Sequence, residues 1–340
     1  MKQMRILRKR NIQTTCRKDR VAIVLLASCI VLANVVASWA QSSRFRIGVL
    51  TPGGRPNAIV LGVRDTLERL GYKEQVNVSY VVEDTEGGVS GLPHRTKYLL
   101  ESKPNVLVAV TTSHAVALKE ATNSVPIVFA WVGDPIGSGL AASYKSSKNN
   151  LTGVSSYAGP ISGKRLEVLK EIAPRVARVL VFVDPNDAGS RIAVKYLEEA
   201  AAKLRVNLVR REATNRQEVE KVMAAVGKDS VDAIYFIPSI VIGAQFDLFL
   251  KRSREDKLPL VAAEATWVEK GALFSYGADF RLVGTQAGRL VAKILDGGKP
   301  SDIPIETPEK YFLAVNVTTA KTIGLKLPRN VLERADRVVE

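Results

Sequence analysis

The sequence predicts an α/β fold made of two doubly wound, Rossmann-like lobes, and three observations support this prediction. Short apolar runs alternate with amphipathic stretches, which is typical of strands and helices in a parallel sheet. The alternation restarts near residue 155 and produces a second set of elements of similar size. The roughly 300 residues after the N-terminal segment are long enough for two domains.

The first set of elements begins at Phe45. Strands are expected at residues 45–50, 76–82, 106–110 and 126–129. Helices are expected at residues 58–70, 92–102, from 113 onward and at 136–143. Gly71 supplies the stop signal for the first of these helices.

The second set continues the same rhythm. Strands are expected at residues 178–183, 206–210, 233–236, 260–261, 273–276 and 311–315. Helices are expected at residues 161–172, 190–204, 216–226, 246–255, 280–295 and 318–323. The loops at residues 149–160 and 277–279 are predicted to cross between the lobes.

The N-terminus predicts export. Eight Lys and Arg with one acid lie in residues 1–20, an apolar run covers residues 21–36, and Ser38 and Ala40 are small. This pattern is typical of a secretory signal peptide that is cleaved after Ala40, in residues 1–40. Two alternatives stay open: an uncleaved membrane anchor, and a lipid anchor at Cys29, since Leu26-Ala27-Ser28-Cys29 resembles a lipobox.

The composition beyond residue 40 excludes several classes of function. Both cysteines, Cys16 and Cys29, lie in the leader, so disulfide and thiol chemistry are not expected in the mature chain. The remaining 41 basic and 33 acidic residues are spread along the chain. No basic block with interleaved aromatic residues occurs, so no nucleic-acid partner is expected.

The loops after the predicted strands hold the candidate ligand residues, because ligands of open parallel sheets bind beyond the carboxyl ends of the strands. In Thr111-Thr112-Ser113, hydroxyls and free backbone N–H groups at a helix start suit a carboxylate or phosphate. The alternative is that Thr112 or Ser113 only caps its own helix. The full candidate set is Thr51, Thr112, Ser113, Trp131, Asp134, Ser155, Tyr157, Asp184, Asn186, Ser239 and Glu264.

Acidic and aromatic members of this set have their own alternatives. Asp134, Asp184 and Glu264 could balance an ammonium group, whereas Asp134 before Pro135 could simply cap the turn that follows. Trp131 and Tyr157 could form a stacking or cation–π wall, or they could fill the core.

Signatures of enzymes and metal sites are missing from the sequence. It contains no G-x-S-x-G elbow, no G-x-x-x-x-G-K-[ST] loop and no H-E-x-x-H motif. His94 and His114 stand apart, so each is interpreted as a surface or hydrogen-bonded histidine and no zinc site is expected. We therefore expect a protein that is not an enzyme and that carries no cofactor or metal.

Nine segments, in order along the chain, resemble one family. They are RIGVL (46–50), LGY (70–72), VPIVF (125–129), VGDPIGSGL (132–140), NLTGVS (150–155), KRLE (164–167), SYG (275–277), TAKTIGL (319–325) and RADRVVE (334–340). Together they are similar to the ABC-transporter substrate-binding proteins, a family that includes members binding tryptophan and other aromatic amino acids. The resemblance covers residues 44–340.

The resemblance implies a type I periplasmic-binding-protein fold, in which three segments form the hinge and a ligand is enclosed in the cleft. It implies a first lobe of residues 44–154 with 277–305, and a second of residues 155–276 with 306–340. The family's cleft loops match Thr51, Thr112, Ser113, Asp134, Asp184 and Glu264 by position. This chain departs from many relatives at Asp184, where they carry asparagine, and at Trp131, where a small residue is common.

The expected function is capture of a small polar metabolite, an amino acid above all, by cleft closure. The resemblance implies a periplasmic or extracytoplasmic monomer that delivers its ligand to an ABC permease and its ATPase. Thr112 and Ser113 are expected to hold the carboxylate, and Asp184 or Glu264 the amine. Two alternatives are a ligand-sensing receptor module of the same fold and an exported α/β hydrolase.

Overall fold

The computed structural model describes residues 45–54, 57–86, 89, 91–227 and 229–340. Residues 45–340 form one compact unit. The leader predicted over residues 1–40, with its cleavage after Ala40 or its lipid anchor at Cys29, lies outside the described residues. None of the helices in the described ranges has the length and hydropathy needed to cross a bilayer.

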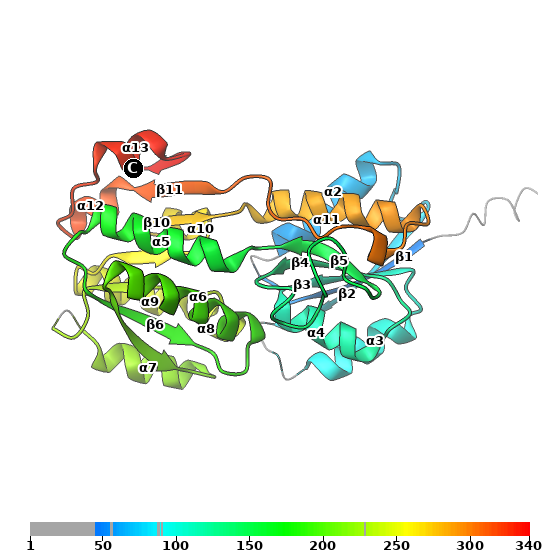
Figure 1. The fold of residues 1–340 in the computed structure, drawn as a ribbon, viewed down its shortest axis with the longest axis horizontal. Helices are drawn as coiled ribbons and strands as arrows, with labels where there is room; N and C mark the ends of the chain where they lie inside the picture. The colour runs from blue at the N-terminus through cyan, green and yellow to red at the C-terminus, as the bar shows by residue number, and fades with distance from the viewer. Residues whose placement is uncertain (1–44, 55–56, 87–88, 90, 228) are drawn as a thin grey trace, which may run out of the picture. The chain divides into compact units, whose positions relative to one another are not determined.

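The first lobe is built on a sheet of five parallel strands in the order β2-β1-β3-β4-β5. The strands are β1 (Phe45–Thr51), β2 (Val78–Asp84), β3 (Val106–Val110), β4 (Ile127–Val132) and β5 (Leu151–Ser155). The helices are α2 (Asn57–Arg69), α3 (Leu92–Glu101), α4 (Thr112–Ala121) and α11 (Phe280–Leu295). Although α2 and α11 are far apart in sequence, they lie side by side (Figure 1).

Helices cover both faces of this sheet, which explains its continuous apolar strands. Alternate residues of β3 point to opposite faces. Val106, Val108 and Val110 belong to the apolar cluster beneath α2 and α11, whereas Leu107 and Ala109 belong to the cluster that includes residues of α3 and α4.

The second lobe is built on a seven-stranded sheet in the order β12-β11-β10-β9-β8-β6-β7. The strands are β6 (Arg178–Val183), β7 (Asn207–Glu212), β8 (Ala233–Tyr235), β9 (Leu260–Ala262), β10 (Phe274–Gly277), β11 (Phe312–Asn316) and β12 (Arg337–Val339). The helices are α5 (Ala158–Ile172), α6 (Ala188–Leu204), α7 (Arg216–Ala225), α8 (Ile240–Gly243), α9 (Phe246–Glu255), α10 (Ala265–Glu269), α12 (Val317–Thr322) and α13 (Arg329–Arg334). Strands β10 and β11 are antiparallel and the other neighbours are parallel.

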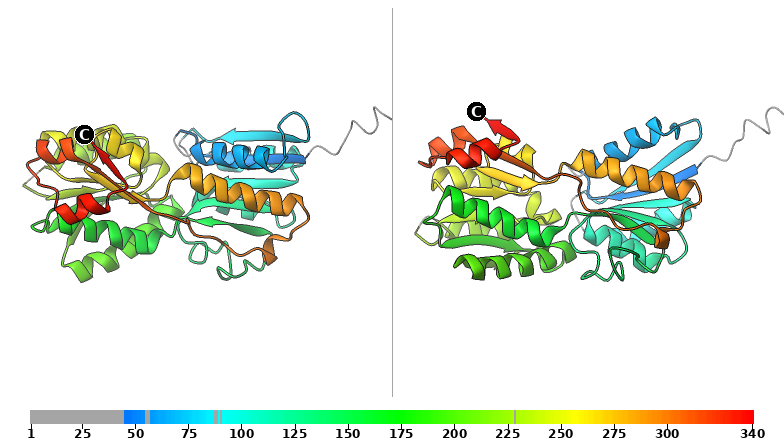
Figure 2. Two further views of the ribbon diagram at one scale, coloured as in Figure 1. Left: turned by 90° about the horizontal axis from the view of Figure 1, so that it is seen from above. Right: turned by 45° about the horizontal axis from the view of Figure 1, so that its top comes forward.

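Three segments connect the lobes, as Figure 2 shows. They are residues 156–157 between β5 and α5, residues 278–279 between β10 and α11, and residues 303–311 between the 3-10 helix η1 (Pro300–Asp302) and β11. The α/β fold with two lobes and parallel sheets is confirmed. The return of residues 280–295 to the first lobe also agrees with the resemblance, while the residue boundaries of the lobes stay a prediction.

Two local predictions were wrong. The segment 136–143 is a series of turns and bends, not a helix. Asp134 accepts hydrogen bonds from the backbone of Ile136 and Gly137, and Gly139 takes a φ of 71°, which ends any helical continuation after one turn. The segment 149–160, predicted to be a loop, contains β5 and the start of α5.

Candidate ligand-binding site

A cavity of about 510 Å³ lies at the carboxyl ends of strands from both sheets. The first lobe lines it with the loops after β1, β3 and β4, and the second lobe with the loops after β6, β8 and β9. Residues of all three connecting segments, among them Ser156, Ala278 and Tyr311, line it too. This is the position at which open α/β sheets bind ligands, and the volume lies within the range of small-molecule sites.

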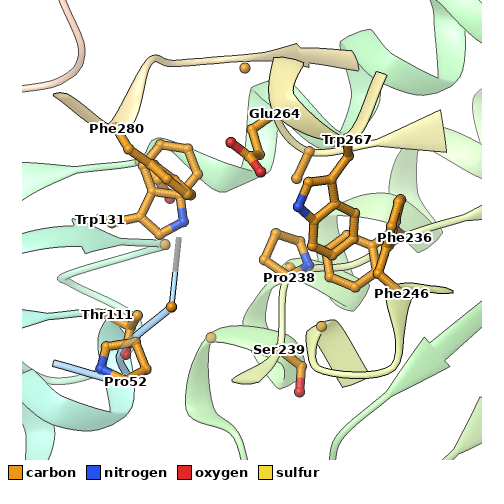
Figure 3. Close-up of a pocket in the computed structure, with 18 of the residues that line it drawn as sticks. Pro52, Thr111, Trp131, Phe236, Pro238, Ser239, Phe246, Glu264, Trp267 and Phe280 are labelled. Carbon is orange, nitrogen blue, oxygen red and sulfur yellow. The ribbon is translucent and has the colours of Figure 1, made fainter. Parts of the chain in front are cut away.

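Aromatic side chains form two opposite walls of the cavity (Figure 3). On the first-lobe side, the rings of Trp131 and Phe280 meet edge to face with centroids 4.7 Å apart. On the second-lobe side, Phe236 and Trp267 are buried with centroids 4.5 Å apart, and Phe246 packs beside them. Each wall offers ring surface to a flat apolar group in the cavity.

Trp131 owes its direction to an irregularity in β4. The register between β4 and β5 shifts between Ala130 and Val132, so Trp131 is the extra residue of a bulge. Its φ of 64° lies in the left-handed region, which a bulky side chain seldom adopts. Bulges of this kind re-aim a side chain next to functional sites. Thr111, on the same wall, also has a positive φ, of 85°.

His114 supports the first-lobe wall through hydrogen bonds to two threonines. It is fully buried, with Nδ1 2.8 Å from Thr111 Oγ1 and Nε2 3.1 Å from Thr85 Oγ1. The Thr85 N–H in turn donates to the Thr51 carbonyl, so the loops after β1, β2 and β3 are joined. Burial lowers the pKa of His114 to about 3, so the ring is neutral and acts as a hydrogen-bonded structural histidine.

Asp187 is a buried acid of the second-lobe wall. Its Oδ1 accepts a hydrogen bond from the Ser190 N–H at 2.8 Å and caps α6. Burial raises the pKa of Asp187 to about 6, the Ser190 N–H opposes this, and the nearby charge of Asp184 adds to the rise.

These two shifted groups predict a pH dependence of stability with opposite signs. Unfolded His114 binds a proton below about pH 6.5 and the folded ring does not until about 3, so its contribution is lost as pH falls. Folded Asp187 binds its proton below about pH 6 and the unfolded carboxyl below 3.8, so stability is gained as pH falls. Between pH 6 and 4 the two contributions cancel.

Replacing one of the two groups should reveal the pH dependence of stability that the other group contributes. Asp187→Asn keeps a capping side chain. In this variant the free energy of unfolding should fall, relative to wild type, by about 1 kcal/mol for each pH unit as the pH is lowered from 6 to 4. In His114→Gln the free energy of unfolding should rise by a similar amount per pH unit over the same decrease in pH. Urea unfolding at pH 7, 6, 5 and 4 measures both, and parallel pH profiles of all three proteins would contradict the assignment.

Four of the residues singled out from the sequence line the cavity: Thr112, Trp131, Ser239 and Glu264. Thr112 Oγ1 accepts a hydrogen bond from the Gly133 N–H, and Glu264 accepts one from the Thr266 hydroxyl. Ser239 donates to Asp184 at 3.3 Å. These residues come from α4, β4 and the loops after β8 and β9, so the structure brings together side chains of both lobes.

The other seven candidates lie around the cavity without lining it. Thr51 accepts from the Gly53 N–H, Ser155 donates to the Val132 carbonyl, and Asp184 accepts from the Asn186 N–H. Ser113 is buried, Asn186 is exposed, and Tyr157 is 41% exposed beside Tyr144. Whether any of these side chains touches a ligand stays a prediction.

Asp134 joins the two lobes outside the cavity. The Tyr196 hydroxyl of α6 donates to Asp134 Oδ2 at 2.9 Å. A Cβ on Gly159 would lie 2.6 Å from the Tyr196 ring, so the missing side chain leaves room for that ring. Gly189 makes a similar close approach, because a Cβ there would lie 3.2 Å from Thr112 Oγ1 of the other lobe.

Several lining residues were missed from the sequence, namely Arg165, Phe236, Phe246, Trp267, Phe280 and Tyr311. Phe236 directly follows β8 and Phe280 follows the second connecting segment. An aromatic residue directly after a buried strand or at the end of a connecting segment is the signal that could have found them.

Comparison with known proteins defines the family. The family described as ABC transporter substrate binding protein matches residues 47–339. The chain belongs to the ABC transporter substrate-binding protein family. This confirms the resemblance found in the sequence, and the family is one of solute-binding proteins.

Two relatives are named for a ligand. A tyrosine-binding protein of Clostridioides difficile (strain R20291) is 27% identical over 266 residues, which are 78% of this chain and 76% of that protein. A domain solved in complex with L-Trp, from Streptococcus pneumonia, is 25% identical with a TM-score of 0.82, and the match covers 87% of this chain and all of that one.

A third relative was solved ligand-free and open. This substrate-binding protein with adhesive properties from Clostridium difficile is 28% identical, and the match covers 87% of this chain and 99% of that one, with a TM-score of 0.64. More distant solute-binding proteins, 15% and 20% identical, share the type I periplasmic-binding-protein fold alone.

Proposed function

We propose that this protein is the extracytoplasmic binding component of an ABC importer and that it captures an aromatic amino acid between its lobes. The observation that supports this most is the pair of aromatic walls, one from each lobe, which face each other across the cavity. A tyrosine-binding and an L-Trp-bound relative agree with a ligand of this class.

Different lining residues contact different groups of the ligand. The aromatic side chain lies between Trp131 with Phe280 and Phe236 with Trp267. Thr112 and Ser239 offer hydroxyls from opposite lobes. Glu264, which is 8% exposed, supplies negative charge for the ligand's ammonium group.

Capture proceeds by closure of the lobes about the three connecting segments. A ligand favours the closed form only if it binds that form more tightly, and a ligand that touches both walls meets this condition. The higher TM-score to the L-Trp complex than to the open, ligand-free relative, at equal coverage of this chain, supports a closed arrangement here. The interlobe contacts of Tyr196 and Gly189 agree with it.

Export and delivery complete the proposal. The basic and apolar leader of residues 1–40 directs the chain out of the cytoplasm, by cleavage after Ala40 or with a lipid anchor at Cys29. The mature monomer then presents its closed form to a membrane permease with its ATPase, which receives the ligand unchanged.

Thermal unfolding with the twenty L-amino acids, one at a time, tests the proposed ligand class. An aromatic amino acid at 100 times its dissociation constant should raise the free energy of unfolding by about 2.7 kcal/mol. Chromatography after incubation should return the ligand chemically intact. Stabilisation by no aromatic amino acid, or conversion of the ligand to a product, would overturn the proposal.

A further inference from the structure

We infer that Arg165 and the Tyr311 hydroxyl form the subsite for the carboxylate of the ligand, at the hinge end of the cavity. This inference rests on the proposed function and specifies the group that makes the protein select an amino acid over an amine. Both residues line the cavity, and the sequence had suggested neither.

Arg165 brings a positive charge into the interior of the cavity. It extends from α5, is 4% exposed, and donates from Nε to the Tyr276 carbonyl at 2.6 Å and from Nη2 to the Ala263 carbonyl at 3.3 Å. Both acceptors are neutral. Among the residues that the structure describes, Arg165 belongs to no ion pair.

This arrangement leaves donors for a ligand. A guanidinium carries five N–H groups; the two carbonyl bonds use two of them, and a hydrogen bond with the buried Tyr235 hydroxyl uses a third. A buried charge is costly unless an opposite charge is placed beside it, and guanidinium matches carboxylate with two parallel hydrogen bonds. A ligand carboxylate would supply the missing negative charge and use the remaining donors.

The buried hydroxyl of Tyr311 independently supports a carboxylate subsite. Its hydroxyl oxygen is buried and has no hydrogen-bond partner among the described residues. Its ring stacks on Tyr276 with centroids 6.1 Å apart, and Tyr276 is the residue whose carbonyl accepts from Arg165. Burial raises the pKa of Tyr311, so the hydroxyl keeps its proton and can donate to an anion.

The positions of these residues suit an α-amino acid. Arg165 bonds the Ala263 carbonyl, and the next residue, Glu264, carries the charge proposed for the ammonium group. The guanidinium is thus bonded to the residue before the acid proposed for the ammonium group, which suits a ligand whose two charged groups share one carbon. By contrast, Thr112 offers one neutral hydroxyl and no positive charge, and Ser113 does not line the cavity.

Calorimetric titration with L-tryptophan and L-tryptophanamide, which lacks the carboxylate, tests the subsite. Wild type should bind the acid about 30-fold more tightly than the amide, as expected for losing a charged hydrogen-bonded pair. Arg165→Gln should lose this preference, with an affinity for the amide that stays within about 3-fold of wild type. Tyr311→Phe should lose about 5-fold on the acid only. Thr112→Val, which tests the competing carboxylate position, should keep the preference.

The contrary outcomes are distinct. If Arg165→Gln lowers the affinity for both ligands equally, Arg165 only holds the carbonyls of the hinge and the inference fails. Loss of the preference in Thr112→Val instead would also overturn it. Should Arg165→Gln not fold, as judged by circular dichroism, the acid-only loss in Tyr311→Phe decides the question.

An experiment with a different probe separates this inference from the proposed function. If wild type binds no aromatic amino acid, the proposed function fails by itself. 3-Phenylpropionate, which keeps a ring and a carboxylate but has no amine, then serves as the probe. Binding that Arg165→Gln abolishes supports the carboxylate subsite, and binding that does not depend on Arg165, or no binding, overturns it.

Discussion

Replacing Trp131 with alanine should weaken binding of an aromatic amino acid by about 100-fold, because a large apolar contact with the ligand is lost. Trp131 forms one wall of the cavity together with Phe280, and its ring faces Trp267 and Phe236 across the gap (Figure 3). Because Trp131 is only half-buried, the change should alter folding stability far less than affinity. Calorimetric titration and thermal unfolding measure the two effects separately.

Tyr157→Ala provides a matched comparison. Tyr157 is also aromatic and also has a positive φ, of 53°, but it is 41% exposed and does not line the cavity. We expect the affinity of this variant to stay within about 2-fold of wild type, because the side chain does not line the cavity. A large loss in Tyr157→Ala together with normal binding in Trp131→Ala would refute the proposed walls.

Replacing Gly284 with alanine should lower the free energy of unfolding by about 3 kcal/mol, the size of a severe overpacking defect. Gly284 lies in α11 where that helix crosses α2, and a Cβ there would sit 2.1 Å from the Ile59 carbonyl oxygen. Backbone cannot yield as a flexible side chain can, so the two helices would have to separate. Urea unfolding followed by circular dichroism measures the loss.

Gly163→Ala is the control for this substitution. Gly163 also lies inside a helix, α5, but a Cβ there would meet only the Ala200 Cβ at an ordinary 3.4 Å. Alanine should therefore stabilise the protein by up to about 1 kcal/mol through its higher helix propensity. Equal destabilisation by both variants would show that contact between α2 and α11 is not the cause.

The sequence predicted most of the fold because the buried strands carry strong apolar runs. β3 and β6 are apolar on both faces and were found at their observed bounds. β5 was missed because its sequence, Leu-Thr-Gly-Val-Ser, is half polar. Its place depends on a contact with the neighbouring strand: Gly153 pairs with Phe129 of β4 so closely that a Cβ would lie 2.1 Å from the Phe129 carbonyl oxygen.

The site could be predicted only to the level of its loops. The rule that ligands bind beyond strand ends located the loops that line the cavity. It could not separate Thr112 from Ser113, because one residue of difference along α4 turns a side chain toward or away from the cavity. Nor could it find Arg165, which reaches the cavity from the second turn of α5 through a long side chain.

Helix α11 has a consequence for the order in which the chain can fold. The apolar cluster of the first lobe includes Val283, Leu290 and Val291, which lie more than a hundred residues after β5. Until residue 295 is available, one face of the first sheet lacks half of its cover. A chain growing from its N-terminus must therefore synthesise β6 to β10, five of the seven strands of the second sheet, before the first lobe can close its core, and β11 and β12 complete the second sheet later still.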